Sequence, residues 1–180
     1  AGTEESFKQL SGQSITLLHV ATHGFYSPLT GHYTAQRSFE EQALSRSGLF
    51  LSGAAASLNM KKIPEDIEDG ILTAKELSKL DLSNLNLAIL SACQTGLGEI
   101  VGDGVFGLQR GFKKAGAQTL LMSLWKVDDT ATQLLMAEFY KNLVSGQNKR
   151  AAFLNAQKYL RSYQNGIYDK PEYWAAFIML

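Results

Sequence analysis

Three short apolar runs stand out along an otherwise polar chain, and each has the length of a buried strand. They occupy residues 14–21, 85–91 and 118–125. Each run is too short for an ordinary helix, and its nearly continuous apolar character is typical of a strand covered on both faces. Weaker patterns predict a short strand at residues 48–51, an edge strand at residues 71–72 and a last strand within residues 173–180.

Helical patterns separate these strands. Thr3 predicts the start of a short first helix, and Thr73 with Glu76 forms a capping-box pattern. Longer helices are expected over residues 105–115, closed by Gly116, from Asp128 or Asp129 to residue 144, closed by Gly146, and over residues 150–163. Residues 24–47 and 59–70 show no sustained period, so we expect loops there. Strands that alternate with helices predict an α/β fold with a parallel sheet flanked by helices on both faces.

Composition bounds the function without naming it. The 180 residues include 17 basic and 17 acidic side chains and 45% hydrophobic positions, which predicts one globular domain over residues 1–180. Balanced, scattered charge argues against nucleic acid and anionic membrane as partners, and no apolar run is long enough to span a membrane. One cysteine allows no intramolecular disulfide and favours a cytoplasmic, reducing location. Both ends look cut, so we expect a fragment of a larger protein.

The only cysteine and one histidine follow the first two buried strands. His23 comes just after the first strand and Cys93 just after the second. If these strands are parallel neighbours about 4.8 Å apart, the two side chains can meet at one edge of the sheet. A thiolate with an adjacent imidazole can attack a peptide carbonyl, and the backbone amides of Gly24 and Cys93 could hold the resulting oxyanion. A cysteine after an apolar strand is also commonly a buried small hydrophobe.

Other chemical interpretations fit less well. A metal site from His19, His23, His32 and Cys93 is disfavoured, because His19 and His23 would stand about 13 Å apart along one strand. We expect His19 to be buried and paired with the backbone, and His32 to lie in a loop. The glycines at positions 102, 104 and 107 match a dinucleotide fingerprint, but that motif must begin directly after its strand. No metal or cofactor is therefore predicted.

Five segments, in order along nearly the whole chain, carry a resemblance to a known family. They are HVATHG (residues 19–24), LSACQTG (90–96), GDGVFGLQRGFKKAGA (102–117), SLWKVDDTAT (123–132) and YWAAFIML (173–180). Together they resemble the CHAT domain, a caspase-like cysteine peptidase domain often fused to tetratricopeptide repeats and related to separase, gingipain and legumain. The resemblance implies a caspase-like, mostly parallel sheet and a catalytic pair of His23 and Cys93. Family domains usually have strands ahead of the histidine strand, which this chain lacks.

The resemblance also bears on substrates and partners. The segment SLWKVDD is similar to a separase segment in which an acidic residue receives a basic side chain, which favours Asp129 over Asp128 as the substrate-binding carboxylate; Asp103 is a lesser candidate. The implied function is endoproteolysis of a protein or peptide after a basic residue, with tetratricopeptide repeats or a partner protein as regulators. Residues 25–47 and 59–70 would shape the groove. The alternative is an inert, peptidase-like scaffold that only docks partners.

Overall fold

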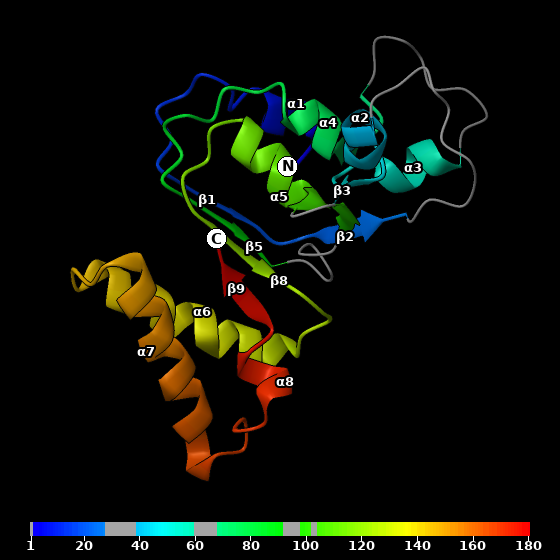
Figure 1. Ribbon diagram of the computed structural model, residues 1–180. Helices are drawn as coiled ribbons and strands as arrows, with labels where there is room; N and C mark the ends of the chain where they lie inside the picture. The colour runs from blue at the N-terminus through cyan, green and yellow to red at the C-terminus, as the bar shows by residue number, and fades with distance from the viewer. Residues whose placement is uncertain (1, 28–38, 60–67, 92–97, 102–103) are drawn as a thin grey trace.

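The main sheet contains the three apolar runs as adjacent strands. The structure, a computed structural model, describes residues 2–27, 39–59, 68–91, 98–101 and 104–180 (Figure 1). Its main sheet has the order β1-β5-β8-β9, where β1 (Leu17–Val20), β5 (Leu87–Leu90) and β8 (Leu120–Ser123) are parallel and β9 (Phe177–Met179) is antiparallel to β8. The predicted mostly parallel sheet is confirmed, although each hydrogen-bonded strand is shorter than its apolar run.

Alternate residues of these strands enter two separate cores. Ala88 and Leu90 join one core, while Leu87 and Ile89 join the other. The first face is covered by α1 (Glu4–Lys8), α4 (Ala74–Leu77) and α5 (Leu108–Lys114), and the second by α6 (Asp129–Val144), α7 (Lys149–Ser162) and α8 (Pro171–Trp174) (Figure 1). Because both faces are covered, both sets of strand side chains are apolar, which is why the runs are nearly continuous.

A second, antiparallel sheet begins two residues after β1 ends. Its order is β2-β3-β4, from β2 (His23–Tyr26), β3 (Ser47–Phe50) and β4 (Ile71–Thr73). The predicted strands near residues 48–51 and 71–72 are confirmed. The predicted loop over residues 24–47 is wrong at both ends, because β2 and α2 (Phe39–Leu44) lie there. A four-residue strand is too short to show a period, and β2 is defined by its pairing with β3.

The glycine-rich region before α5 forms a hairpin of β6 (Gly98–Val101) and β7 (Gly104–Gly107). The predicted helix start at residue 105 is therefore wrong, because residues 104–107 pair with β6 and α5 begins at Leu108. Gly111 allows α5 to lie against α4, since a Cβ there would come 2.7 Å from the Ala74 carbonyl oxygen. Two short elements complete the fold: α3 (Ala54–Leu58) and a 3₁₀ turn, η1 (Tyr163–Asn165).

The predicted helix ends agree closely with the structure. Thr73 and Glu76 form both hydrogen bonds of a capping box, and Thr3 caps α1. Gly116 and Gly146 follow α5 and α6 with φ of +101° and +90°, which a glycine adopts without strain. The predicted last strand is only partly correct, because residues 171–174 form α8. Within the described residues, no helix is both long and apolar enough to cross a membrane.

Candidate active site

His23 lies where the chain passes from the main sheet to the second sheet. Val20 ends β1, two residues follow, and His23 is the first residue of β2, opposite Phe50 of β3. The hydroxyl of Thr22 donates a hydrogen bond to the Phe50 carbonyl oxygen and so fixes this corner. The imidazole of His23 is exposed. His23 therefore stands at the carboxyl end of β1, as predicted, but at a junction between two strands rather than at the start of a loop.

The strand register brings the residues that precede His23 and Cys93 to one edge of the sheet. β1 and β5 are parallel neighbours with Val20 opposite Leu90, which confirms the expected pairing. The Ser91 N–H donates to the Val20 carbonyl at 3.0 Å, so the pairing continues one residue past β5. His23 and Cys93 each come three residues after this matched pair. Cys93 itself lies outside the described residues.

The backbone amide of Gly24 is directed away from β3. Hydrogen-bonded and non-hydrogen-bonded positions alternate along an antiparallel pair. The Ser27 N–H donates to the Arg46 carbonyl at 2.8 Å, which makes Phe25 and His23 hydrogen-bonding positions as well. Gly24, between them, does not bond to β3, and β2 is the outer strand of its sheet. This amide is thus oriented to donate to a group outside the ladder.

Asp128 and Asp129 have different local roles. A carboxylate oxygen of Asp128 accepts the Ala131 N–H at 2.8 Å, so Asp128 is the N-cap of α6. Asp129 is the first residue of the helix; it is exposed and has no hydrogen bond or ion pair to another described residue. The expectation that one of the two aspartates caps the helix is confirmed for Asp128. The carboxylate of Asp129 remains available to a ligand.

His19 was predicted to be buried and paired with the backbone, and this is wrong. Its side chain is exposed at one edge and contacts two hydroxyls: Nε2 lies 2.6 Å from Ser91 Oγ, and Nδ1 lies 2.7 Å from Tyr140 Oη on α6. Packing against these groups lowers the pKa of His19 by desolvation. Strand alternation could have revealed the contact, because His19 and Ser91 share the face of β1 and β5 that α6 covers.

One acidic cluster was not anticipated from the sequence. Among the described residues, Glu4, Glu68 and Glu76 are the one group of possible metal ligands whose ligand atoms approach within 4.8 Å of one another. The Lys8 ammonium lies 2.7 Å from Glu4, 2.7 Å from Glu68 and 3.2 Å from Glu76, so it already occupies the centre. These ion pairs connect α1 to the start of α4.

Two candidates from the sequence, His32 and Asp103, lie outside the described residues.

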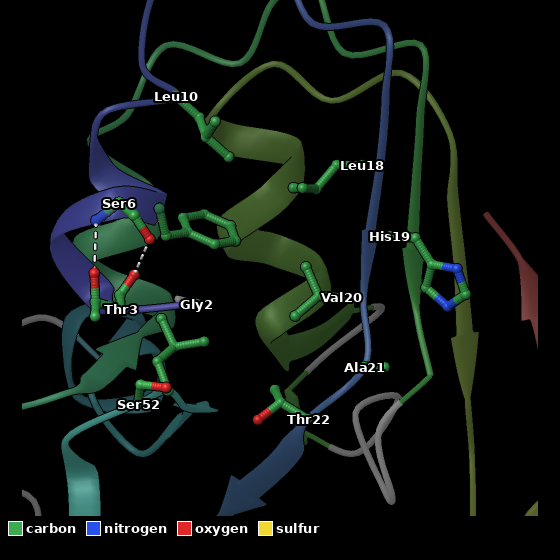
Figure 2. Close-up of a pocket in the computed structure, with 12 residues that line it drawn as sticks. Gly2, Thr3, Ser6, Leu10, Leu18, His19, Val20, Ala21, Thr22 and Ser52 are labelled. Atoms are coloured by element: carbon green, nitrogen blue, oxygen red, sulfur yellow. Dashed lines mark hydrogen bonds between the residues drawn. The ribbon is translucent and has the colours of Figure 1, made fainter.

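A cavity of about 500 Å³ lies beside β1 and reaches the candidate site at Thr22 (Figure 2). Its walls come from α1, β1 and the end of β3. Figure 2 shows Leu18 and Val20 directed toward α1 and α5, whereas the His19 ring points to the opposite face of the strand. Leu18 and Val20 therefore direct their side chains into the cavity, whereas His19, which also lines it, directs its ring to the other face of the strand.

A family model, the CHAT domain, matches residues 1–180. The chain belongs to the CHAT domain family. Tetratricopeptide repeat protein 28 of Mus musculus is 34% identical over 110 residues, which cover 61% of this chain and 4% of the relative. Its Homo sapiens counterpart is 32% identical over 114 residues, 63% of this chain and again 4% of the relative. This CHAT domain therefore corresponds to a small part of these relatives, whose name refers to tetratricopeptide repeats.

Proposed function

We propose that this CHAT domain is a caspase-like cysteine endopeptidase with His23 and Cys93 as its catalytic pair. The observation that carries the proposal is the parallel pairing of β1 with β5, with Val20 opposite Leu90. The last described residue before Cys93, Ser91, still pairs with Val20, three residues before His23. This supports a position of the thiol and the imidazole at the same edge of the sheet. An exposed imidazole at that edge is free to exchange protons with a substrate.

The reaction would proceed through an acyl-enzyme. The Cys93 thiolate attacks the peptide carbonyl carbon, a C–S bond forms, and the carbonyl oxygen becomes an oxyanion. The C–N bond then breaks as the His23 imidazolium gives its proton to the departing amine. His23 next removes a proton from water, the resulting hydroxide attacks the thioester carbonyl, and the carboxylic acid and the Cys93 thiolate are released. Every proton and electron pair is accounted for without a cofactor.

The Gly24 amide is suited to stabilise the oxyanion, together with the amide of Cys93. Gly24 immediately follows His23, and its N–H points away from β3 at the outer strand of the second sheet. An amide directed out of a ladder can donate to a developing charge without losing a backbone hydrogen bond. The absence of a Cβ lets a substrate approach closely. Both points support the assignment of Gly24 to the oxyanion site.

Asp129 is our candidate for the carboxylate that binds a basic substrate side chain. Because Asp128 is engaged as the N-cap, Asp129 is the member of the pair whose side chain is free of described partners. A carboxylate pairs with a guanidinium through two parallel hydrogen bonds, which favours arginine over neutral residues. We therefore propose cleavage after arginine or lysine in a protein or peptide.

The wider setting is also a proposal. The matched relatives are far longer than residues 1–180 and carry a tetratricopeptide-repeat name, which supports a single CHAT domain within a larger protein whose repeats or partner regulate it. The chain has one cysteine, and a catalytic thiol must stay reduced. The cytoplasm provides that condition.

Hydrolysis of a fluorogenic peptide that ends in arginine tests the proposal. We expect the 180-residue chain to turn over this substrate and Cys93→Ala to lose turnover completely while it keeps the wild-type unfolding midpoint. Slow iodoacetamide alkylation of Cys93, equal in the wild type and in His23→Ala, together with no hydrolysis, would instead identify an inert scaffold.

A further inference from the structure

A chain of side-chain hydrogen bonds links three elements at the edge of the sheet where the catalytic pair is proposed. The His19 ring of β1 lies between the Ser91 hydroxyl, 2.6 Å from Nε2, and the Tyr140 hydroxyl of α6, 2.7 Å from Nδ1. The two rings are also in contact, with centroids 5.9 Å apart. We call these three residues the His19 network.

Both hydrogen bonds can form at once on a neutral ring. A neutral imidazole has one donor nitrogen and one acceptor nitrogen, and each hydroxyl can take either role. Desolvation lowers the pKa of His19, which keeps the ring neutral near pH 7. The His19 network is therefore complete under the conditions in which a peptidase would act. No charged side chain among the described residues forms an ion pair with His19.

The His19 network lies where both strands lead into the residues proposed to react. Ser91 directly follows β5 and is the last described residue before the segment that carries Cys93; its hydroxyl bonds to His19 of β1. His19 stands four residues before His23 on the other strand. The hydrogen bond between His19 and Ser91 thus connects β1 to the end of β5, shortly before His23 and Cys93 in the sequence. Tyr140 connects the His19 ring to α6, a helix of sixteen residues.

We propose that His19 and Tyr140 are positioning residues that act through Ser91 to fix the start of the Cys93 segment relative to His23. This inference rests on the proposed function, because it takes Cys93 as the nucleophile. Reacting groups must be held within a fraction of an ångström of their productive arrangement, and a displacement of about 1 Å can cost about 100-fold in rate. The hydrogen bonds of the His19 network would hold the ends of β1 and β5 in a fixed arrangement. They do not involve His23, whose imidazole can still exchange its proton.

Single hydroxyl deletions test the His19 network with little change in volume. Ser91→Ala and Tyr140→Phe should each lower kcat for the arginine peptide by about 10- to 100-fold and leave KM unchanged, because the nucleophile and not the substrate pocket is displaced. Ser91→Thr retains the hydroxyl and should restore kcat. Tyr159→Phe is the matched control, since Tyr159 is exposed on α7 and its hydroxyl has no hydrogen bond to another described residue.

A second measurement does not depend on peptidase activity. Cys93 is the only cysteine, so the rate of iodoacetamide alkylation against pH reports its thiolate alone. In the wild type we expect the midpoint of this profile, which is the apparent pKa of the Cys93 thiol, to lie below the ordinary value of about 8.5, because the nearby imidazole would stabilise the thiolate. In Ser91→Ala and Tyr140→Phe it should return toward that value, and in Ser91→Thr it should not.

The outcomes separate the two proposals. One result is an active wild type for which Ser91→Ala and Tyr140→Phe have the same kcat and alkylation profile as Tyr159→Phe. That result overturns the positioning role and agrees with the peptidase proposal. Failure of Ser91→Thr to restore kcat also overturns it. An inactive wild type with an ordinary thiol profile overturns the peptidase itself. If Ser91→Ala lowers the unfolding midpoint, Tyr140→Phe, at a half-buried helix position, carries the test.

Discussion

His19 and His23 are four residues apart, yet their surroundings are opposite. Both side chains are exposed. The His19 ring is held at both nitrogens by Ser91 and Tyr140, and desolvation by the groups packed against it lowers its pKa. No other described residue forms a hydrogen bond with the His23 ring. A group that must donate and accept protons during a reaction needs a free nitrogen, whereas a group that holds a scaffold needs its hydrogen bonds filled. The contrast separates the residue proposed to react from the residue proposed to position.

The same division recurs at the start of α6. Asp128 is bound by the Ala131 amide, while its neighbour Asp129 has a free carboxylate. In both pairs, one residue is held by hydrogen bonds to described partners, and the other has no such partner. Four sets of substitutions test this contrast, and they follow in order of decreasing expected effect.

The largest effect should come from the two histidines. His23→Ala removes the proposed acid and base and should lower kcat/KM for an arginine peptide by about 10²- to 10⁴-fold. His19→Gln should cost less, because it disturbs only the placement of Cys93. Steady-state kinetics of both variants measure the difference. Equal losses, or a larger loss in His19→Gln, would contradict the assignment of His23 as the reacting residue.

The next effect concerns substrate choice. Asp129→Asn removes the charge proposed to bind arginine and should lower the preference for an arginine over a neutral peptide by about 10- to 100-fold, as expected for a charge-assisted pair. Asp128→Asn is the matched control, because asparagine caps a helix as well as aspartate. Competition between the two peptides measures the preference. A preference lost in Asp128→Asn rather than in Asp129→Asn would reverse the two roles.

For the stability of the fold, substitution of Asp128 should have a larger effect than substitution of Asp129, the reverse of their effects on substrate preference. Asp128→Ala deletes the acceptor for the Ala131 N–H and should lower the free energy of unfolding by about 1 kcal/mol. Asp129→Ala should cost less, because that side chain only adds negative charge near the helix N-terminus. Urea unfolding of the two variants gives both values. A greater loss in Asp129→Ala would show that Asp129, too, has a structural partner.

The smallest effect is a pH dependence of stability from His19. Its pKa in the folded state lies below the ordinary 6.5 because of burial. The unfolded chain therefore binds a proton first as pH falls below 6.5, and stability is lost between that value and the lower folded pKa. Urea unfolding at pH 7 and at pH 5 should show a smaller loss in His19→Gln than in the wild type. Identical losses would exclude His19 as the source.

The sequence predicted the buried strands and the helix ends better than the short strands between them. The three buried strands, the capping box at Thr73 and the glycine stop at residue 116 depend on local patterns, and all are present. The apolar runs and the α/β alternation predicted a parallel sheet; that β1 and β5 are neighbours in it was only assumed, and the structure contains this pairing. β2 and the β6–β7 hairpin were missed because four-residue strands exist only through their partners.

The candidate site shows the same limit. Position after a strand was enough to select His23 and Cys93, and the resemblance added the preference for Asp129. The His19 network was missed because its bonds join residues that are 72 and 121 positions apart. The alternation of β1 predicts which face His19 occupies, but only the packing of α6 brings Tyr140 to that ring. The orientation of the Gly24 amide likewise depends on the register with β3.

The most direct test of the account is covalent labelling by an arginine chloromethyl ketone peptide, read by intact mass and peptide mapping. We expect one adduct per chain at Cys93, formed much faster than with the corresponding neutral peptide and slowed strongly in His23→Ala. Labelling that is equally slow in the wild type and in His23→Ala, with no preference for arginine, would contradict it.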